Sequence, residues 1–136
     1  MLAYANAGTQ YNQYRQQSAM TASPGELTLM LYDGCIKDMK LARMGIEGKD
    51  LHMANENSKK AQAILDELMR TLDMQYPLAQ QMMRLYDFIL NLVVQSNVKK
   101  DVEPLDTALE LITDMRDTWQ QAVRLNRQRM GTATQA

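Results

Sequence analysis

Cys35 and His52 are the two side chains in this sequence that could serve as a nucleophile and its general base. The chain contains one cysteine and one histidine, so no other Cys–His pair can form. The hydrophobic spacing around Cys35 places it on the inward face of a predicted helix, where cysteine behaves as a small apolar residue. We therefore interpret Cys35 as structural and expect no catalytic residues.

The residues that could bind a metal ion or a phosphate group do not complete a site. His52 and Glu56 lie four residues apart and could share a metal, but two ligands make a poor site and the chain has no second histidine. Residues 45–48 include two glycines but are not followed by the Lys-Ser/Thr pair of a phosphate-binding loop. We expect neither a metal nor a cofactor.

Length and charge narrow the class of protein. A chain of 136 residues that is 46% hydrophobic can bury one core of ordinary size, so we expect one domain. The 15 basic and 16 acidic residues nearly cancel, which leaves no strong field for nucleic acid or an anionic membrane. Arg124, Arg127 and Arg129 form a small basic patch near the chain end, where cations suit the C-terminus of a helix. We expect no nucleic acid partner.

The expected compartment follows from features that the sequence lacks. The segment MLAYANAGTQ at its start has neither the basic nor the long apolar region of a signal peptide. No apolar stretch reaches the roughly 20 residues needed to cross a bilayer. A single cysteine cannot form an intramolecular disulfide and fits a reducing cytosol. These observations predict a cytoplasmic protein without membrane insertion.

The segment Ser23-Pro24-Gly25-Glu26 predicts the start of the first helix, because it has the spacing of a capping box with proline at the first helical position. We expect this helix to end near Gly45 or Gly48, because a glycine there can take the left-handed conformation that closes a helix. Few glycines and prolines and many Leu, Met, Ala, Gln, Lys and Glu residues favour helices throughout the chain.

Three more helices follow from hydrophobic spacing. They are predicted from Asp50 to Leu72, from Tyr76-Pro77 to the polar turn at residues 96–101, and from about Pro104 with Ala122 still facing inward. Short connections between four helices predict an all-α fold, an antiparallel four-helix bundle over residues 23–130. Residues 1–22 lack a sustained period and are interpreted as a flexible N-terminal arm, and residues 131–136 as a frayed tail.

The first and third predicted helices carry more apolar surface than a bundle helix must bury. At 100° per residue their apolar arcs span about 250° and about 200°, against about 140 to 160° for the second and fourth. The arm, a second copy of the chain or a segment of another protein could cover the excess. Twelve methionines suit either core filling or an adaptable binding surface. The edges of the wide arcs are candidates for a client-binding groove, each with a core position as the alternative: Leu29, Tyr32, Ile36, Met39, Met83, Tyr86, Leu90 and Val94.

The residues TASPGELTLMLYDGCIK, positions 21–37, resemble the signature of the flagellar secretion chaperone FliS family, the export chaperones of flagellin. The resemblance continues at Lys60-Ala61-Gln62, at Leu85-Tyr86-Asp87-Phe88 and at Met115 to Trp119. It covers most of the chain beyond Tyr14, in the order of the family.

This resemblance implies a cytosolic, non-enzymatic helical bundle that binds the disordered C-terminal segment of flagellin. Binding would prevent premature polymerisation and keep flagellin competent for flagellar type III secretion, with a component of the flagellar export gate as a second partner. The resemblance also implies that the arm can pack on the bundle, with Tyr14 as a lid residue that the client displaces. The alternative is a self-associating structural helical bundle without a client. We expect a monomer or a weak homodimer.

Overall fold

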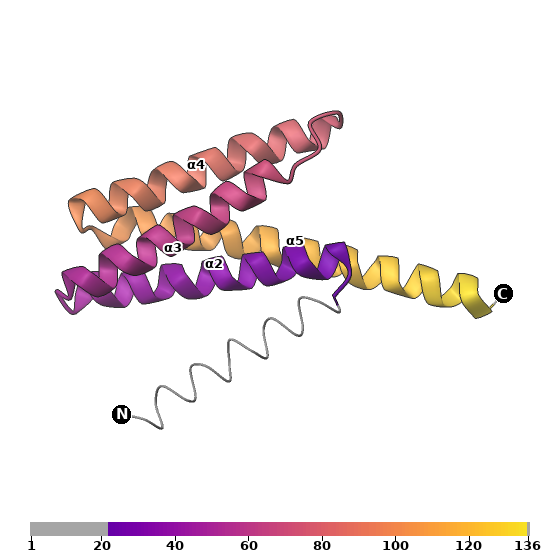
Figure 1. The fold of residues 1–136 in the computed structure, drawn as a ribbon, viewed down its shortest axis with the longest axis horizontal. Helices are drawn as coiled ribbons and strands as arrows, with labels where there is room; N and C mark the ends of the chain where they lie inside the picture. Colours follow the sequence, from indigo (N-terminus) through magenta and orange to yellow (C-terminus); the bar gives the residue numbers. More distant parts are fainter. Residues whose placement is uncertain (1–21, 136) are drawn as a thin grey trace, which may run out of the picture.

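The structure, a computed structural model, describes the backbone of residues 22–135 and the side chains of residues 22–129. This part of the chain forms four helices and no strand: α2 (Pro24–Glu47), α3 (Leu51–Arg70), α4 (Pro77–Lys99) and α5 (Val102–Gln135). Successive helices run in opposite directions (Figure 1). The predicted all-α antiparallel bundle is confirmed. The arm expected at residues 1–22, including Tyr14, lies outside the described residues except for its last position.

Each helix of the bundle has two neighbours. α2 packs most extensively against α3 and also against α5, and α4 packs against the same two helices. α2 and α4 therefore lie diagonally opposite each other across the core. The α2–α3 and α4–α5 turns lie together at one end of the bundle, which we call the closed end (Figure 1). The N-terminus of α2 and the connection between α3 and α4 lie toward the other end, which we call the open end.

The first turn of α2 is fixed by the predicted capping box. The Ser23 hydroxyl accepts a hydrogen bond from the backbone N–H of Glu26 at 3.3 Å, and the Glu26 carboxylate accepts one from the N–H of Ser23 at 3.4 Å. Pro24 occupies the first helical position, where its missing N–H leaves no bond unmade. Asp50 caps α3 in a similar way, because its carboxylate accepts a bond from the N–H of Met53 at 3.0 Å.

The turn after α2 differs from the predicted left-handed glycine. Gly48 has an ordinary φ of −82°, and Lys49 takes the left-handed conformation with a φ of 57°. The N–H groups of Lys49 and Asp50 donate to the carbonyls of Ile46 and Gly45, at 3.2 and 2.8 Å, which is the bond pair of a Schellman motif. Because Asp50 must then begin α3 at once, the left-handed position falls one residue after the glycine.

Small side chains let the helices approach closely at the closed end. A Cβ atom on Gly45 would lie 2.5 Å from the backbone nitrogen of Ala54 and 2.9 Å from its Cα atom, so glycine is required where α2 crosses α3. Ala42, Ala54, Ser58 and Ser96 are also buried toward this end. Both serine hydroxyls are paired: that of Ser58 accepts from Gln62 at 3.1 Å and that of Ser96 donates to the carbonyl of Asp101 at 2.6 Å.

Larger side chains occupy the core toward the open end. Tyr32 of α2 and Tyr86 of α4 are buried there, their hydroxyl groups form a hydrogen bond, and their ring centroids lie 6.3 Å apart. Leu68 and Ile89 are fully buried beside this level of the core. The α3–α4 pair diverges from α2 and α5 toward the α3–α4 connection (Figure 1). The core therefore widens from small residues at one end to paired tyrosines near the other.

Three ion pairs join α2 to α5 along their shared side. Arg43 contacts Asp106 at 2.6 Å, Arg116 contacts Asp33 at 2.8 Å, and Arg127 contacts Glu26. These side chains are partly exposed, so each pair contributes little free energy of folding. α2 supplies the basic residue in one pair and the acidic residue in the other two. A shift of one helix along the other would therefore bring like charges together. The pairs therefore favour the observed register.

α5 continues beyond the level at which its neighbours bury it. Among the side chains of α5 that the structure describes, up to Arg129, Ile112 is the last fully buried one, and Ala122, expected to face inward, is exposed. Beyond Ile112, Met115 and Trp119 still pack against the core, and the Trp119 indole N–H donates to the carbonyl of Gly25 in the first turn of α2 at 2.8 Å. The helix runs to Gln135, so the tail expected at residues 131–136 is helical up to residue 135. The Gln, Arg and Met residues up to Met130 are good helix formers, whereas Gly131, Thr132 and Thr134 are poor ones, so propensity accounts for the helix only as far as Met130.

The core holds three side chains with perturbed acidities. Cys35 is fully buried, with its Sγ atom 3.7 Å from the Met39 sulfur and 3.8 Å from the carbonyl oxygen of Ala61. Burial, with a smaller effect of the nearby Asp38 charge, raises the pKa of the Cys35 thiol to about 12. Burial likewise raises the pKa of the tyrosines at positions 32 and 86.

Replacing Gly45→Ala should destabilise the bundle, because the new methyl group collides with the backbone of Ala54. Overpacking costs about 1–3 kcal/mol, more than the roughly 1 kcal/mol that alanine gains over glycine as a helix former. Urea unfolding followed by circular dichroism measures the change. Gly25→Ala in the same helix is the control, since its methyl group would meet one side-chain methyl group of Val123, at 3.2 Å, and no backbone atom. Equal stability of both variants would contradict the close-approach explanation.

The tyrosine pair should show coupled energetics. Tyr86→Phe leaves the Tyr32 hydroxyl buried without its partner, which costs about 1–3 kcal/mol of folding free energy. The double variant Tyr32→Phe/Tyr86→Phe removes both hydroxyl groups and should cost clearly less than the two single changes added together. Unfolding free energies of the four proteins give this double-mutant cycle. Additive costs would mean that the two hydroxyl groups do not interact.

Stability should fall under alkaline conditions. The unfolded chain loses its thiol proton near pH 8.5 and its tyrosine protons near pH 10, whereas the folded thiol keeps its proton to about pH 12. The contribution of the thiol and the two tyrosines to the free energy of unfolding should therefore be constant below about pH 8.5 and decrease above it. In Cys35→Ala the decrease should begin only near pH 10. Urea unfolding midpoints of the parent protein and of Cys35→Ala, measured from about pH 7 to about pH 11, test this prediction. Identical pH dependence in the two proteins would contradict the raised pKa of the Cys35 thiol.

Candidate protein-binding surface

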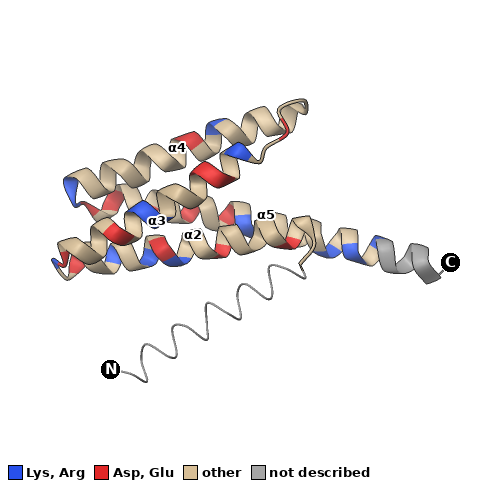
Figure 2. Cartoon of the chain, in the orientation of Figure 1, with Lys and Arg blue, Asp and Glu red and all other residues tan. Residues whose placement is uncertain are grey.

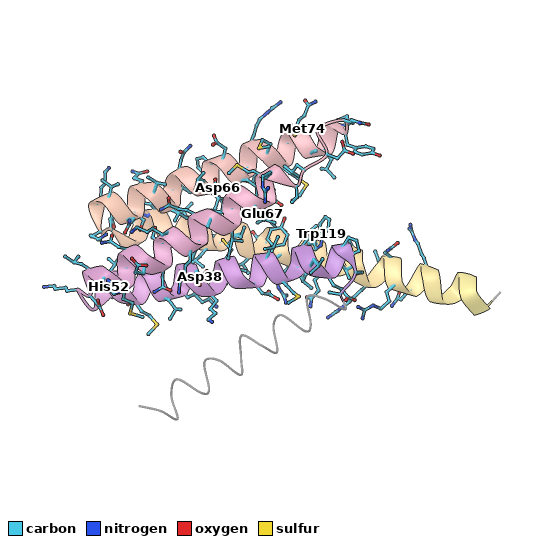
Figure 3. The ribbon with its side chains drawn as sticks, in the orientation of Figure 1. Asp38, His52, Asp66, Glu67, Met74 and Trp119 are labelled. Carbon is cyan, nitrogen blue, oxygen red and sulfur yellow. The ribbon has the colours of Figure 1, made fainter. Side chains whose placement is uncertain are left out.

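The Cys–His pair considered from the sequence does not form. His52 is exposed in the first turn of α3 (Figure 3), whereas Cys35 is buried beside Ala61. Ala61 lies nine residues after His52, roughly 14 Å along the helix. Because its pKa is raised to about 12, the Cys35 thiol is protonated at neutral pH. Within residues 22–129, no group of three or more His, Cys, Asp or Glu side chains could hold a metal ion.

Three of the eight residues predicted for a client-binding groove lie in the core. Tyr32, Met39 and Tyr86 are almost completely buried, so they do not line the surface in this conformation. The reason is geometric: the buried positions of α2 follow the spacing of Tyr32, Cys35, Met39 and Ala42, which makes this stripe the centre of the apolar arc. Tyr86 occupies the corresponding central position on α4. These residues are corrected to core positions.

Leu29 and Ile36 lie on the side of α2 that faces α5. Leu29, Ile36 and Arg43 are spaced seven residues apart and therefore form nearly one line along the helix. Arg43 marks the direction of this line, because it pairs with Asp106 of α5. Both apolar side chains are half-buried, and Ile36 packs against the core. We call Leu29 and Ile36 the α2–α5 surface.

Met83, Leu90 and Val94 lie on the side of α4 that faces α3. Met83 and Leu90 share a line with Asn97, and Val94 lies one turn after Leu90. Asn97 marks the direction, because the Lys100 ammonium group donates to the side-chain oxygens of both Asn97 and Asn55 of α3, each at 2.6 Å. We call Met83, Leu90 and Val94 the α3–α4 surface. It lies on the opposite side of the bundle from the α2–α5 surface, so the two halves of the predicted groove do not meet.

The opposite flank of α4 carries a second apolar stripe that the sequence reasoning did not select. Leu85 and Leu92 are half-buried against the core, and Phe88 beside them is 52% exposed. Their helical positions place them away from Leu90, toward α5. The signal available in the sequence was the lone phenylalanine of the chain at the edge of a wide apolar arc.

Exposed apolar side chains also gather at the open end. Met74, Tyr76 and Leu78, in and just after the α3–α4 connection, are all exposed, and Leu78 is 64% exposed. Trp119 is half-buried and lies on α5, which diverges from the α3–α4 connection, as the labels of Met74 and Trp119 show in Figure 3. Leu78 is exposed because α4 begins beyond its neighbours, so this side chain of the first turn has nothing to pack against.

The two helices with wide apolar arcs, α2 and α4, therefore differ in how much of their apolar surface is covered. On α2, only Leu27 and Met44 remain exposed among the large apolar residues, because α3 and α5 cover the rest. α4 leaves apolar side chains on both flanks, and Val98 near its end is 77% exposed. α4 also carries only three charged residues (Figure 2). None of the described helices is long and apolar enough to cross a membrane.

Comparison with known sequences identifies relatives over most of the chain. Residues 6–126 match the family described as "Flagellar protein FliS". The chain is 44% identical over 117 residues to the flagellar secretion chaperone FliS of Bacillus subtilis (strain 168), a match that covers 86% of this chain and 88% of that protein. It is 30% identical over 115 residues to the flagellar secretion chaperone FliS of Salmonella typhimurium, with 82% and 85% covered.

The fold is also found in a solved structure. A crystal structure of a flagellar chaperone from bacteria superimposes with a TM-score of 0.69, covering 87% of this chain and 98% of that one at 22% sequence identity. At this identity the structural similarity supports the fold alone, and membership of the family rests on the sequence matches. The resemblance first seen in the segment from Thr21 to Lys37 thus extends over the whole bundle. The chain belongs to the FliS family of flagellar secretion chaperones.

Proposed function

We propose that this protein is a cytoplasmic export chaperone that binds the disordered C-terminal segment of flagellin, prevents its premature polymerisation and keeps it competent for flagellar type III secretion. The observation that carries the proposal is the apolar surface on both flanks of α4, which the described chain leaves uncovered. Large exposed apolar patches on a soluble bundle are characteristic of protein-binding sites. Membership of a family of secretion chaperones supports the export role.

The chemistry of the site suits binding rather than catalysis. The client contributes apolar side chains at helical spacing, and these replace water on the flanks of α4. Met83 lies on the α3–α4 surface, and its flexible thioether adapts to differently shaped client side chains. No nucleotide or cofactor is needed, since release can follow from competition by the next partner.

The positions of the apolar surfaces constrain how a client binds. The α3–α4 surface and the α2–α5 surface lie on opposite sides of the bundle, and the open end carries further apolar side chains. A single amphipathic helix can cover only one of these surfaces. We propose that the flagellin segment passes around the bundle and contacts more than one surface, with Leu29, Ile36, Met83, Leu90 and Val94 among its contacts.

The N-terminal arm acts as a competitor in this proposal. The last residue of the arm, Ala22, directly precedes the capping box of α2, whose Gly25 carbonyl accepts a hydrogen bond from Trp119. Tyr14 serves as its anchor, because a tyrosine in a polar segment can dock its ring while its hydroxyl stays in water. Client binding displaces the arm, and a component of the flagellar export gate then receives the loaded chaperone. Truncation of residues 1–20 should therefore strengthen flagellin binding.

A titration of the full chain with flagellin tests the proposed function. Isothermal titration calorimetry should show one flagellin per chaperone, and flagellin without its C-terminal segment should not bind. Light scattering of the chaperone alone measures self-association, for which we expect a monomer or a weak homodimer. A stable homodimer that ignores both flagellin forms would favour the self-associating structural bundle instead and would overturn the chaperone proposal.

Val94→Lys should weaken flagellin binding by about tenfold or more, because a charge replaces an apolar side chain worth roughly 1.5–3 kcal/mol when fully buried. Its far-ultraviolet circular dichroism should stay that of the parent, since Val94 lies outside the core cluster. The matched control is Gln95→Lys, which adds the same charge to the next residue, on the outer side of α4. Equal affinity of the two variants would remove Val94 from the binding surface.

A further inference from the structure

The end of α5 differs in charge from the rest of the molecule. After Asp117 the sequence contains no acidic residue, and its charged residues are Arg124, Arg127 and Arg129. The chain as a whole has a formal net charge of −1, so this segment is locally basic against a balanced background. Figure 2 shows these basic positions on the part of α5 that extends past the bundle.

This segment of α5 is held in place from one side. The Trp119 indole N–H donates to the carbonyl of Gly25, and Arg127 forms an ion pair with Glu26. Glu26 is also the acidic member of the capping box of α2, so the same carboxylate joins the start of α2 to α5. The first turn of α2 thus fixes one side of the helix and leaves its other side to solvent.

The side turned away from α2 combines basic and apolar character. Leu125 and Arg129 lie two residues before and after Arg127, which places each about 160° around the helix from the residue that contacts α2. Leu125 is 57% exposed, Arg129 is exposed, and the two are neighbours because they are four residues apart. Arg124 is exposed and lies between Arg127 and Leu125 around the helix, about 60° from the first and about 100° from the second, so it borders this side. We call Arg124, Leu125 and Arg129 the distal face of α5.

The distal arginines lack an acidic partner in the part of the chain that the structure describes. The ion pairs of residues 22–129 that involve an arginine of this segment are limited to Arg127 with Glu26. An arginine side chain offers five N–H donors in a planar arrangement that matches a carboxylate. Because the helix fixes the backbone on both sides of the exposed leucine, the entropy lost when a partner binds is mainly that of the arginine side chains.

We propose that the distal face of α5 is a second docking surface, separate from the apolar client surface on α4, for a protein segment of acidic amphipathic character. The carboxylates of the partner pair with Arg124 and Arg129, and an apolar side chain of the partner covers Leu125. Charge complementarity selects the partner, because the face carries positive charge without a neighbouring acid. The inference does not require that flagellin be the client of the α4 flanks.

A nucleic acid fits this face less well than a protein. Nucleic acid affinity grows with the number of phosphates that basic side chains neutralise, and only two arginines here are not already paired with Glu26. An exposed leucine between them contributes nothing to a phosphate backbone. The rest of the chain adds no positive field, given the net charge of −1.

The experiment uses the full chain and a designed helical peptide with leucines at helical spacing flanked by glutamates. A second peptide has glutamine in place of each glutamate, and a DNA duplex serves as a third probe. Fluorescence anisotropy in low salt should give an affinity for the glutamate peptide about tenfold or more above that for the other two probes, and the difference should shrink as salt is added.

Variants locate the binding. Arg124→Gln/Arg129→Gln should reduce the affinity for the glutamate peptide to that for the glutamine peptide, and Leu125→Ser should reduce the affinity for both peptides. Lys40→Gln/Lys99→Gln, which removes two exposed positive charges outside α5, should leave both affinities unchanged. Equal binding of the two peptides, unchanged binding by the arginine variant, or tighter binding of the duplex would each overturn the proposal.

Discussion

The contact between Gly45 and Ala54 determines the shape of the whole bundle. With no side chain at position 45, α2 and α3 touch backbone to backbone at the closed end. Tyr32 and Tyr86 then fill the core farther along, and their size holds the diagonal helices apart. A bundle that is narrow at one end and wide at the other cannot bury both ends equally. The exposed apolar side chains of the α3–α4 connection and of the first turn of α4 follow from this geometry.

Much of the fold could be predicted because its signals are local. The capping box at Ser23 and Glu26, the cap at Asp50 and the hydrophobic spacing place the helices to within a few residues. The left-handed Lys49 could not be predicted, since it depends on how a Schellman motif shares residues with the next cap. The length of α5 was not predicted, because Gly131 and the two threonines that follow it are poor helix formers.

The candidate site was less predictable because it depends on which helices are neighbours. Apolar arcs gave the amount of surplus surface on α2 and α4 but not its direction. Only the ion pair of Arg43 and the hydrogen bonds of Lys100 show that Ile36 and Leu90 face opposite sides of the bundle. Tyr32 and Tyr86 were selected for the surface because each lies in a wide arc, and the diagonal packing of α2 and α4 turns both inward.

The contrast between α2 and α4 has a consequence for the range of clients. Ion pairs fix α2 against α5 in one register, whereas none of the three charged side chains of α4 forms an ion pair within residues 22–129. α4 is held mainly by apolar contacts, which carry no directional preference. Apart from the Tyr32–Tyr86 hydrogen bond, which joins α4 to α2, small shifts of α4 therefore break fewer directional contacts than shifts of α2 along α5 would. Under the proposed function, shifts of this one helix would let a single chaperone bind flagellin segments that differ in sequence without any change in the rest of the fold.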